Sequence, residues 1–275
     1  MMKIYHIAFL MLAVFLVTAF SGCTGYGPEY GPEEIEDFSG EYEAGNDTVL
    51  MVTNVNGQIE INSWEGDRVT LEATKRTRYG KDELDKVEII VTESDNEIKI
   101  ETIYHAFEDA RVSVDMDIKV PNNVPVDFVE TTNGNIQISD TKGDTTAAGT
   151  NGAIIIRNVD GYVKASTTNG AIDIRGTTGI DDLETTNGKI DAQIFDFKDD
   201  VDIKCTNGGI TLSINPSLNA DIEMETTNGE ISVNDIALVL TGIEKTHMEA
   251  ILGNGGNKIY IKTTNGNVNL NKLVV

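Results

Sequence analysis

The chain contains few of the residues on which many site chemistries depend. Among its 275 residues there are 2 Cys, 5 Pro, 1 Trp and 3 His. Two cysteines cannot build the disulfide framework of a small secreted domain. Three histidines supply a zinc site or a histidine-based catalytic triad poorly. No disulfide-stapled fold and no histidine-rich site are therefore expected.

Basic residues are also scarce. The chain has 21 Lys and Arg against 45 Asp and Glu, a formal net charge of −24. Such a charge repels nucleic acid and anionic lipid headgroups, so neither is expected as a partner. The acidic surplus instead keeps a β-rich protein soluble and discourages pairing between exposed sheet edges.

Only one long apolar run is present, over residues 7–20, and it ends at Ser21-Gly22-Cys23. The run is shorter than a comfortable bilayer span and closes on small residues, which is typical of a signal peptide. The junction resembles the lipobox of secreted lipoproteins, although Phe20 stands where Leu is usual. That resemblance implies a signal peptide over 1–22 and a lipid anchor on Cys23. The alternative is an uncleaved membrane anchor, and either one places the mature domain on the outer side.

Residues 23–47 are predicted to be the anchor cysteine followed by an acidic linker. Tyr26-Gly27-Pro28-Glu29 is repeated over residues 30–33, and the segment combines Pro, Gly and acid without apolar periodicity. Asn46 begins the chain's single Asn-X-Thr motif, which is a weak signal for glycosylation.

The tripeptide Thr-Asn-Gly recurs through the C-terminal half of the chain. Its asparagines are Asn133, Asn151, Asn169, Asn187, Asn207, Asn228 and Asn265. A short fixed period indicates one small unit stacked on copies of itself. Stacking puts like positions about 4.8 Å apart, so we expect these asparagines to form a structural ladder rather than to contact a ligand. Asn-Gly also predicts a turn, because both residues accept positive φ.

Alternating apolar residues flank each Asn-Gly turn. The positions three and five residues after the asparagine are aliphatic, as in Ile136 and Ile138, and so is the position four residues before it, as in Val129. Period-two alternation indicates strands with one buried face. Each repeat of about 18–21 residues is therefore strand, turn, strand, turn. The predicted fold class is an all-β solenoid with two short strands per coil.

The region before the repeats follows the same pattern less regularly. Val55-Asn56-Gly57 is an outlying copy of the motif, and the insertion after it is rich in alternating strands and hairpin signals. Only residues 81–86 look helical. We predict one domain over 48–275, with an irregular part over 48–127 and the Thr-Asn-Gly coils over 128–275.

The sequence carries few signals of a catalytic or ligand-binding site. His105 and His247 stand alone in the sequence, the Asn-Gly turns lack the Lys-Ser/Thr and helix of a phosphate loop, and no calcium-binding nonapeptide pattern occurs. We expect no catalytic residue, no cofactor and no metal ligand. Cys205 replaces a threonine in a column of threonines, so it is interpreted as a buried and inert thiol.

One outward cluster is a candidate contact patch. Asp173 and Asp191 follow their asparagines by four residues, and Arg157 and Arg175 follow theirs by six, which places all four on one face near the middle of the stack. Stacked like charges repel unless they are compensated. Pairing between the arginines and aspartates is the simple interpretation, and a ligand or partner site is the alternative.

The order of these features resembles the putative-adhesin β-solenoid family, a domain of unknown function. The resemblance covers nearly everything from about residue 48 onward. It rests on the serial Thr-Asn-Gly coils and on Gly253-Asn254-Gly255-Gly256-Asn257 running through Lys258-Ile259-Tyr260-Ile261 into the last repeat. It implies a β-solenoid and an envelope location, and it supplies no catalytic residues.

Three function classes remain open. The first is a non-catalytic, lipid-anchored surface scaffold for binding or adhesion, on the extracellular side of the cytoplasmic membrane, with an unknown surface protein or glycan as partner. The second is an envelope structural or stress-related module that binds another protein. The third is a carbohydrate-active β-helix enzyme, which the small coils disfavour, and fold alone does not decide among the three.

Overall fold

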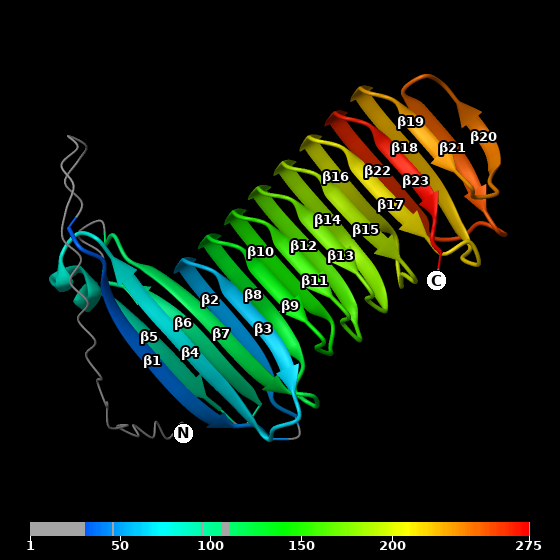
Figure 1. Cartoon of the computed structure of the whole chain (residues 1–275). Coiled ribbons are helices and arrows are strands. Elements are labelled where there is room, and N and C mark those ends of the chain that lie inside the picture. Colours follow the sequence, from blue (N-terminus) through cyan, green and yellow to red (C-terminus); the bar gives the residue numbers. More distant parts are fainter. Residues whose placement is uncertain (1–30, 46, 95, 106–109, 275) are drawn as a thin grey trace, which may run out of the picture.

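A computed structural model describes residues 31–45, 47–94, 96–105 and 110–274. The predicted signal peptide over 1–22, Cys23 and Asn46 lie outside the described residues. The described chain is an elongated β-solenoid in which short coils stack along the long axis (Figure 1). Two sheets of 11 and 12 strands face each other and run the length of the molecule. The predicted all-β solenoid with two strands per coil is confirmed.

Each Thr-Asn-Gly coil joins one strand of the 12-stranded sheet, sheet B, to one strand of the 11-stranded sheet, sheet A. The sheet B strands of these coils are β8 (Val126–Asn133), β10 (Thr145–Asn151), β12 (Tyr162–Asn169), β14 (Gly179–Asn187), β16 (Val201–Asn207), β18 (Ala220–Asn228) and β22 (Lys258–Asn265). Their sheet A partners are β9 (Ile136–Ser139), β11 (Ile154–Arg157), β13 (Ile172–Arg175), β15 (Ile190–Ile194), β17 (Ile210–Ile214), β19 (Ile231–Asn234) and β23 (Val268–Lys272).

Both ends of the solenoid are closed by antiparallel strands. The N-terminal part consists of β1 (Glu34–Glu43), β2 (Val49–Asn56), β3 (Ile59–Trp64), β4 (Arg68–Thr77), the 3-10 helix η1 (Lys81–Lys86), β5 (Val87–Glu93), β6 (Glu97–Tyr104) and β7 (Ser113–Pro121). In it β4 pairs antiparallel with β1 and β7, and β5 with β6. At the other end β20 (Val239–Ile243) and β21 (His247–Leu252) continue sheet B beyond β18. None of the described helical residues forms a segment long and apolar enough to cross a bilayer.

The core is the thin layer between the two sheets. Val129, Ile136 and Ile138 are fully buried, and the equivalent side chains of the next coils are also buried. Ile231 and Val233 are only partly buried, because β19 is the outermost strand of sheet A. In most strands one face therefore builds the core and the other faces solvent, whereas β20 has no buried residue.

The coils do not stack in the order of the chain. Sheet A runs β1-β4-β7-β3-β9-β11-β13-β15-β17-β23-β19, and sheet B runs β20-β21-β18-β22-β16-β14-β12-β10-β8-β2-β6-β5. The last coil, β22–β23, therefore lies between β16–β17 and β18–β19, and β6–β7 lies outside β2–β3. The repeat spacing alone suggested serial stacking. At each end the chain instead passes outward first and then returns to fill an inner position.

The predicted linker needs correction over residues 34–43. These residues form β1, which pairs along its whole length with β4, from Glu34 opposite Thr77 to Glu43 opposite Arg68. Phe38 and Tyr42 pack against the core, whereas Ile35 is 50% exposed. The strand lies at the edge of the sheet and is acidic, with few apolar residues. The alternation of apolar and polar residues is therefore weak in its sequence, and the strand is recognised by its backbone hydrogen bonds to β4.

In the Asn-Gly turns positive φ falls on glycines, such as Gly57 at 121° and Gly208 at 152°, and not on the asparagines. Among the described non-glycine residues, Asp140, Asn158 and Asp235 have φ of 59°, 53° and 58°. Each directly follows a sheet A strand, and Gly176 at the same place after β13 has φ 67°. Asp, Asn and Gly are the residues that adopt this left-handed conformation readily. The left-handed turn is therefore the one that leaves sheet A.

Candidate functional site

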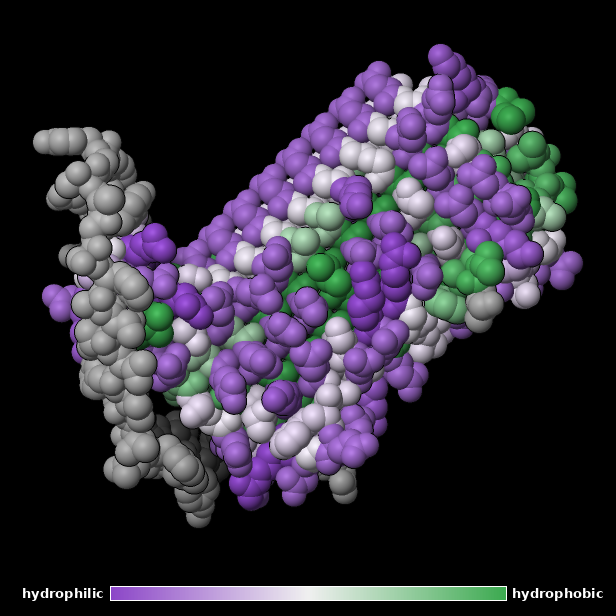
Figure 2. Space-filling model, in the orientation of Figure 1, coloured by the Kyte–Doolittle hydropathy of each residue, from purple (hydrophilic) through white to green (hydrophobic). Residues whose placement is uncertain are grey.

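The repeat asparagines lie in one exposed row along a long edge of the solenoid. Together with Asn56 they follow the spatial order 56, 133, 151, 169, 187, 207, 265 and 228. The Nδ2 of each donates to the Oδ1 of the previous one at 2.6–2.9 Å. Figure 2 shows hydrophilic side chains repeating along this edge. Each amide already has partners in its own row, so the geometry favours a structural role.

A column of glycines follows the asparagine row. A Cβ built on Gly152 would lie 1.8 Å from the carbonyl oxygen of Gly134, and one on Gly208 would lie 1.8 Å from that of Gly188. These distances are far below any van der Waals contact. The backbone of the neighbouring coil occupies the space that a side chain would need. Glycine is therefore required here by the stacking of the coils as much as by the turn.

Buried threonines two residues before the asparagines bond to these same glycine carbonyls. Thr185 donates to Gly170 at 2.9 Å, and Thr263 donates to Gly208 at 2.8 Å. Cys205 takes this position in its coil, where its Sγ lies 3.1 Å from the Gly188 oxygen. Burial raises the pKa of the Cys205 thiol. The thiol is thus a weak hydrogen-bond donor in a packed column and stays protonated near neutral pH.

The four residues of the predicted contact patch do meet on the outer face of sheet A. Arg157 Nη2 lies 2.5 Å from Asp173 Oδ2, Arg175 Nε lies 3.1 Å from Asp173 Oδ1, and Arg175 Nη2 lies 3.0 Å from Asp191 Oδ1. The four side chains are 30–43% exposed. Two positive and two negative groups compensate one another in a single row, which leaves little unpaired charge for a partner.

The outer face of sheet B carries a second cluster around Tyr260 of β22. Lys258, Lys262 and, from β16, Lys204 lie with their Nζ atoms 5.4, 5.9 and 5.6 Å from the centre of the Tyr260 ring. This is the range of cation–π attraction. The Tyr260 hydroxyl donates to Glu225 Oε2 at 2.8 Å. Tyrosine is one of the residues enriched at the energetic hot spots of protein interfaces.

A shallow open depression adjoins this cluster. Its lining includes Asp182, Asp202, Glu223, Lys258 and Tyr260, which come from four neighbouring strands of sheet B. The strand alternation puts all of these side chains on the solvent face. The sequence does not reveal this face, because its residues lie in separate repeats that only the stacking brings together.

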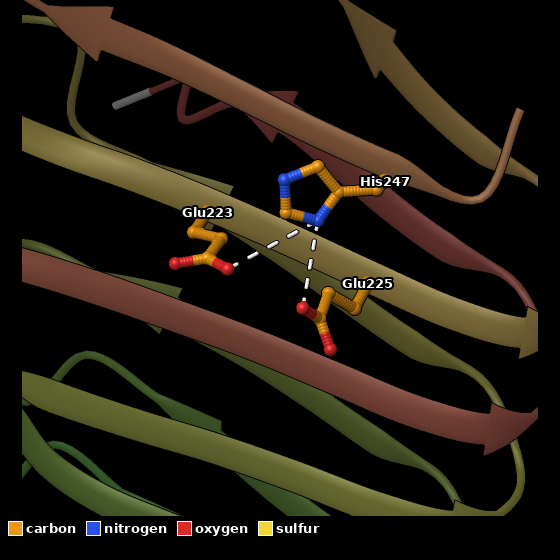
Figure 3. Close-up of side chains that lie close together, drawn as sticks. All are labelled: Glu223, Glu225 and His247. Carbon is orange, nitrogen blue, oxygen red and sulfur yellow. Dashed lines mark ion pairs between the residues drawn. The ribbon is translucent and has the colours of Figure 1, made fainter. Parts of the chain in front are cut away.

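Beside the depression, β18 and β21 carry the His247 cluster, which consists of Glu225, His247, Glu249 and Glu223, the last of which also lines the depression. The antiparallel register puts Glu225 opposite His247 and Glu223 opposite Glu249. His247 Nδ1 lies 3.5 Å from Glu225 Oε1 and 4.0 Å from Glu223 Oε1, and Nε2 lies 3.4 Å from Glu249 Oε1. In Figure 3 the His247 ring lies over the two carboxylates of β18 with Nδ1 directed between them.

Hydrogen bonds from β22 lower the pKa of one carboxyl in the His247 cluster. Lys262 and Tyr260 donate to Glu225 and hold the pKa of that carboxyl below its usual value. Lys258 pairs with Glu223, and this bond raises the pKa of the lysine. His247 therefore does not stand alone. Its partners on β18 lie far from it in the sequence, so no ligand spacing could reveal them. His105, by contrast, pairs only with Glu88, at 3.2 Å, among the described residues.

Comparisons with known proteins place the fold. A family model described as Toastrack DUF4097 matches residues 41–271. No curated protein matches the chain. A crystal structure described as a putative cell adhesion protein from Clostridium sporogenes is 13% identical, with a TM-score of 0.40, covering 87% of this chain and 100% of that one. A putative adhesin from Bacteroides fragilis is 11% identical, with a TM-score of 0.43, covering 86% and 97%. Structural similarity at these identities and TM-scores does not transfer a function from one protein to another.

Proposed function

Because the chain belongs to the Toastrack DUF4097 family, a domain of unknown function, we propose that it is a rigid, non-catalytic scaffold of the cell envelope. In this proposal a lipid on Cys23 tethers the protein to the outer face of the cytoplasmic membrane. The solenoid then presents its outer sheet faces to a surface protein or a glycan. Its parallel coils make a stiff rod whose side-chain rows are fixed by the stacking, as in other solenoids that bind along one face.

The contact surface in this proposal is the outer face of sheet B around Tyr260. This choice rests on the three lysines whose Nζ atoms lie 5.4–5.9 Å from the centre of the Tyr260 ring. A shallow depression with acidic walls lies next to them. Tyrosine supplies a large amphipathic contact with few rotatable bonds. The arginine–aspartate row on sheet A is the weaker candidate, because its four side chains pair with one another and none of them is aromatic.

Photo-crosslinking in the native cells tests this surface with the full-length protein. A benzoylphenylalanine at position 260 should give one discrete adduct, whereas the same group at position 137, on the outer face of β9, should give none. Digestion of the adduct with protease or glycosidase tells a protein partner from a glycan. The Arg157→Ala, Arg175→Ala double variant is the control and should leave the adduct at position 260 unchanged. No adduct at 260, or equal adducts at both positions, would remove this face from the proposal.

The anchor has its own test. Cys23→Ser removes the thiol that would carry the lipid, so the variant should leave the membrane fraction or remain unprocessed. Cys205→Ser serves as the matched control and should fractionate like the native protein. If Cys23→Ser fractionates and migrates like the native protein, lipid anchoring is wrong, and the contact surface can still be tested.

A further inference from the structure

We propose that Glu223, Glu225 and His247 bind a divalent transition-metal ion of the zinc type on the outer face of sheet B. One ligand atom from each of these residues lies within 4.8 Å of the other two, and His247 Nδ1 faces an Oε1 oxygen of both glutamates. Zinc bonds to imidazole nitrogen and carboxylate oxygen of about 2.0–2.1 Å put tetrahedral ligands roughly 3.3 Å apart. The observed Nδ1 separations of 3.5 and 4.0 Å need only a small closure of the side chains.

The backbone holds these ligands in register. Glu223 and Glu225 alternate with an inward residue on β18, so both project from the same face. His247 is the direct partner of Glu225 on the antiparallel strand β21. Three ligands on two hydrogen-bonded strands form a preorganised set, because neither strand has to move for them to meet. The side chains are 18–31% exposed, so an ion can reach them from solvent.

The outer oxygens of the two carboxylates are already occupied. Lys258 bonds to Glu223 Oε2, while Lys262 at 2.9 Å and Tyr260 at 2.8 Å bond to Glu225 Oε2. Both Oε1 atoms are thereby directed at His247. Each carboxylate thus keeps one oxygen for the ion, while a bond from β22 fixes the other oxygen. Lysines and a tyrosine in this position act as orienting groups behind the ligands.

The opposite side of the imidazole has a carboxylate of its own. Glu249 Oε1 lies 3.4 Å from His247 Nε2. A hydrogen on Nε2 directed at Glu249 leaves the lone pair of Nδ1 facing the two glutamates. This is the carboxylate–histidine–metal arrangement that fixes the tautomer of many ligating histidines. An imidazole with carboxylate ligands suits zinc and its neighbours better than magnesium or calcium, which prefer oxygen alone.

Calorimetry on the full-length, tag-free protein in detergent tests the site. After treatment with EDTA, the protein is titrated with Zn²⁺ in millimolar Mg²⁺, which occupies weak carboxylate sites elsewhere on the acidic surface. We expect one tight site. His247→Gln should weaken its Kd at least about tenfold, while the matched control His105→Gln should leave the Kd unchanged. Far-UV circular dichroism confirms that both variants keep their strands.

Cobalt supplies a readout that a structural ion pair would not produce. Co²⁺ should give a visible d–d absorption with the native protein, and His247→Gln should lose it. Glu249→Gln should keep the band but weaken the Kd about 10–100-fold, as expected for an orienting group. The proposal is overturned if the native protein shows no tight zinc site, or if His247→Gln binds Zn²⁺ as tightly as the native chain. Neither result depends on whether the Tyr260 face has a partner.

Discussion

At the residue scale, the repeat is maintained by three columns with different physical reasons. Asparagine amides bond along an exposed row, buried threonine hydroxyls bond to carbonyls of the neighbouring coil, and glycines leave room for the next backbone. The glycine column has the strictest requirement, because no rearrangement of a flexible side chain can relieve a clash with a backbone carbonyl.

Gly208 and Gly209 are adjacent and allow a matched comparison. A Cβ on Gly208 would lie 1.8 Å from the Gly188 oxygen, whereas one on Gly209 would have its nearest contact at 3.3 Å. Other coils carry Ala153 or Ala171 at the place of Gly209. Gly208→Ala should cost about 2–4 kcal/mol, as overpacking and strain usually do, and Gly209→Ala less than about 1 kcal/mol. Urea denaturation measures both, and equal losses would contradict the steric explanation.

Cys205 tests the threonine column. Cys205→Thr restores the hydroxyl found in neighbouring coils and should keep or raise the stability. Cys205→Val fills a similar volume but leaves the Gly188 carbonyl without its side-chain donor, so it should lose about 1 kcal/mol relative to Thr. Thermal melts of the two variants under reducing conditions compare them directly. A valine variant as stable as the threonine variant would show that the column only fills space.

At the element scale, the edge strand β1 is the strand that the sequence pattern indicates least clearly. It has acidic residues at five of its ten positions, which protects an exposed edge against pairing with other chains. Its hydrogen bonds to β4 and its two partly buried aromatic rings hold it on sheet A. The opposite end differs, since β20 has no charged residue and exposes Val239, Leu240 and Ile243. Figure 2 shows hydrophobic side chains at that end.

Two substitutions in β1 separate a packed strand from a linker. Phe38 packs against the core, so Phe38→Ala should destabilise the protein by about 1–3 kcal/mol. Ile35 is 50% exposed on the other face of the strand, and Ile35→Ala should have little effect. Chemical denaturation of the two variants makes the comparison. If neither substitution changes the midpoint, β1 does not contribute to the stability of the folded domain.

At the scale of the whole molecule, charge and topology matter most. Like charges recur at the spacing of stacked strands, and the net charge of −24 opposes compaction. The ion pairs on both faces offset part of this repulsion, but partly exposed pairs contribute little, about 0–1 kcal/mol each.

Salt should therefore stabilise the protein. Raising KCl from about 0.01 M to about 1 M shortens the Debye length from about 30 Å to about 3 Å. Because net repulsion outweighs the exposed pairs, the Tm should rise. Calorimetric scans at pH 7 measure this rise, and the same scans near pH 4, where carboxylates begin to protonate, should show a smaller one. A Tm that falls with salt at pH 7 would mean that the ion pairs dominate.

Local sequence periodicity is enough to define the coil. Period-two alternation around Thr-Asn-Gly predicted two strands per repeat, and residues such as Ile136 and Ile154 are buried where that pattern puts them. The same periodicity also predicted that the arginines pair with the aspartates in the row of Arg157, Asp173, Arg175 and Asp191. These features follow from local periodicity, because each depends only on positions within one repeat or on the same position in the next.

The neighbours of each coil, by contrast, depend on contacts between residues far apart in the sequence. The insertion of β22–β23 between β16–β17 and β18–β19 brings Lys258, Tyr260 and Lys262 beside Glu223 and Glu225. The antiparallel return of β21 brings His247 to the same place. Every coil has nearly the same edges, so the local pattern is satisfied by several stacking orders. The order is chosen by long-range strand pairing at the ends, and the candidate metal site exists because of that choice.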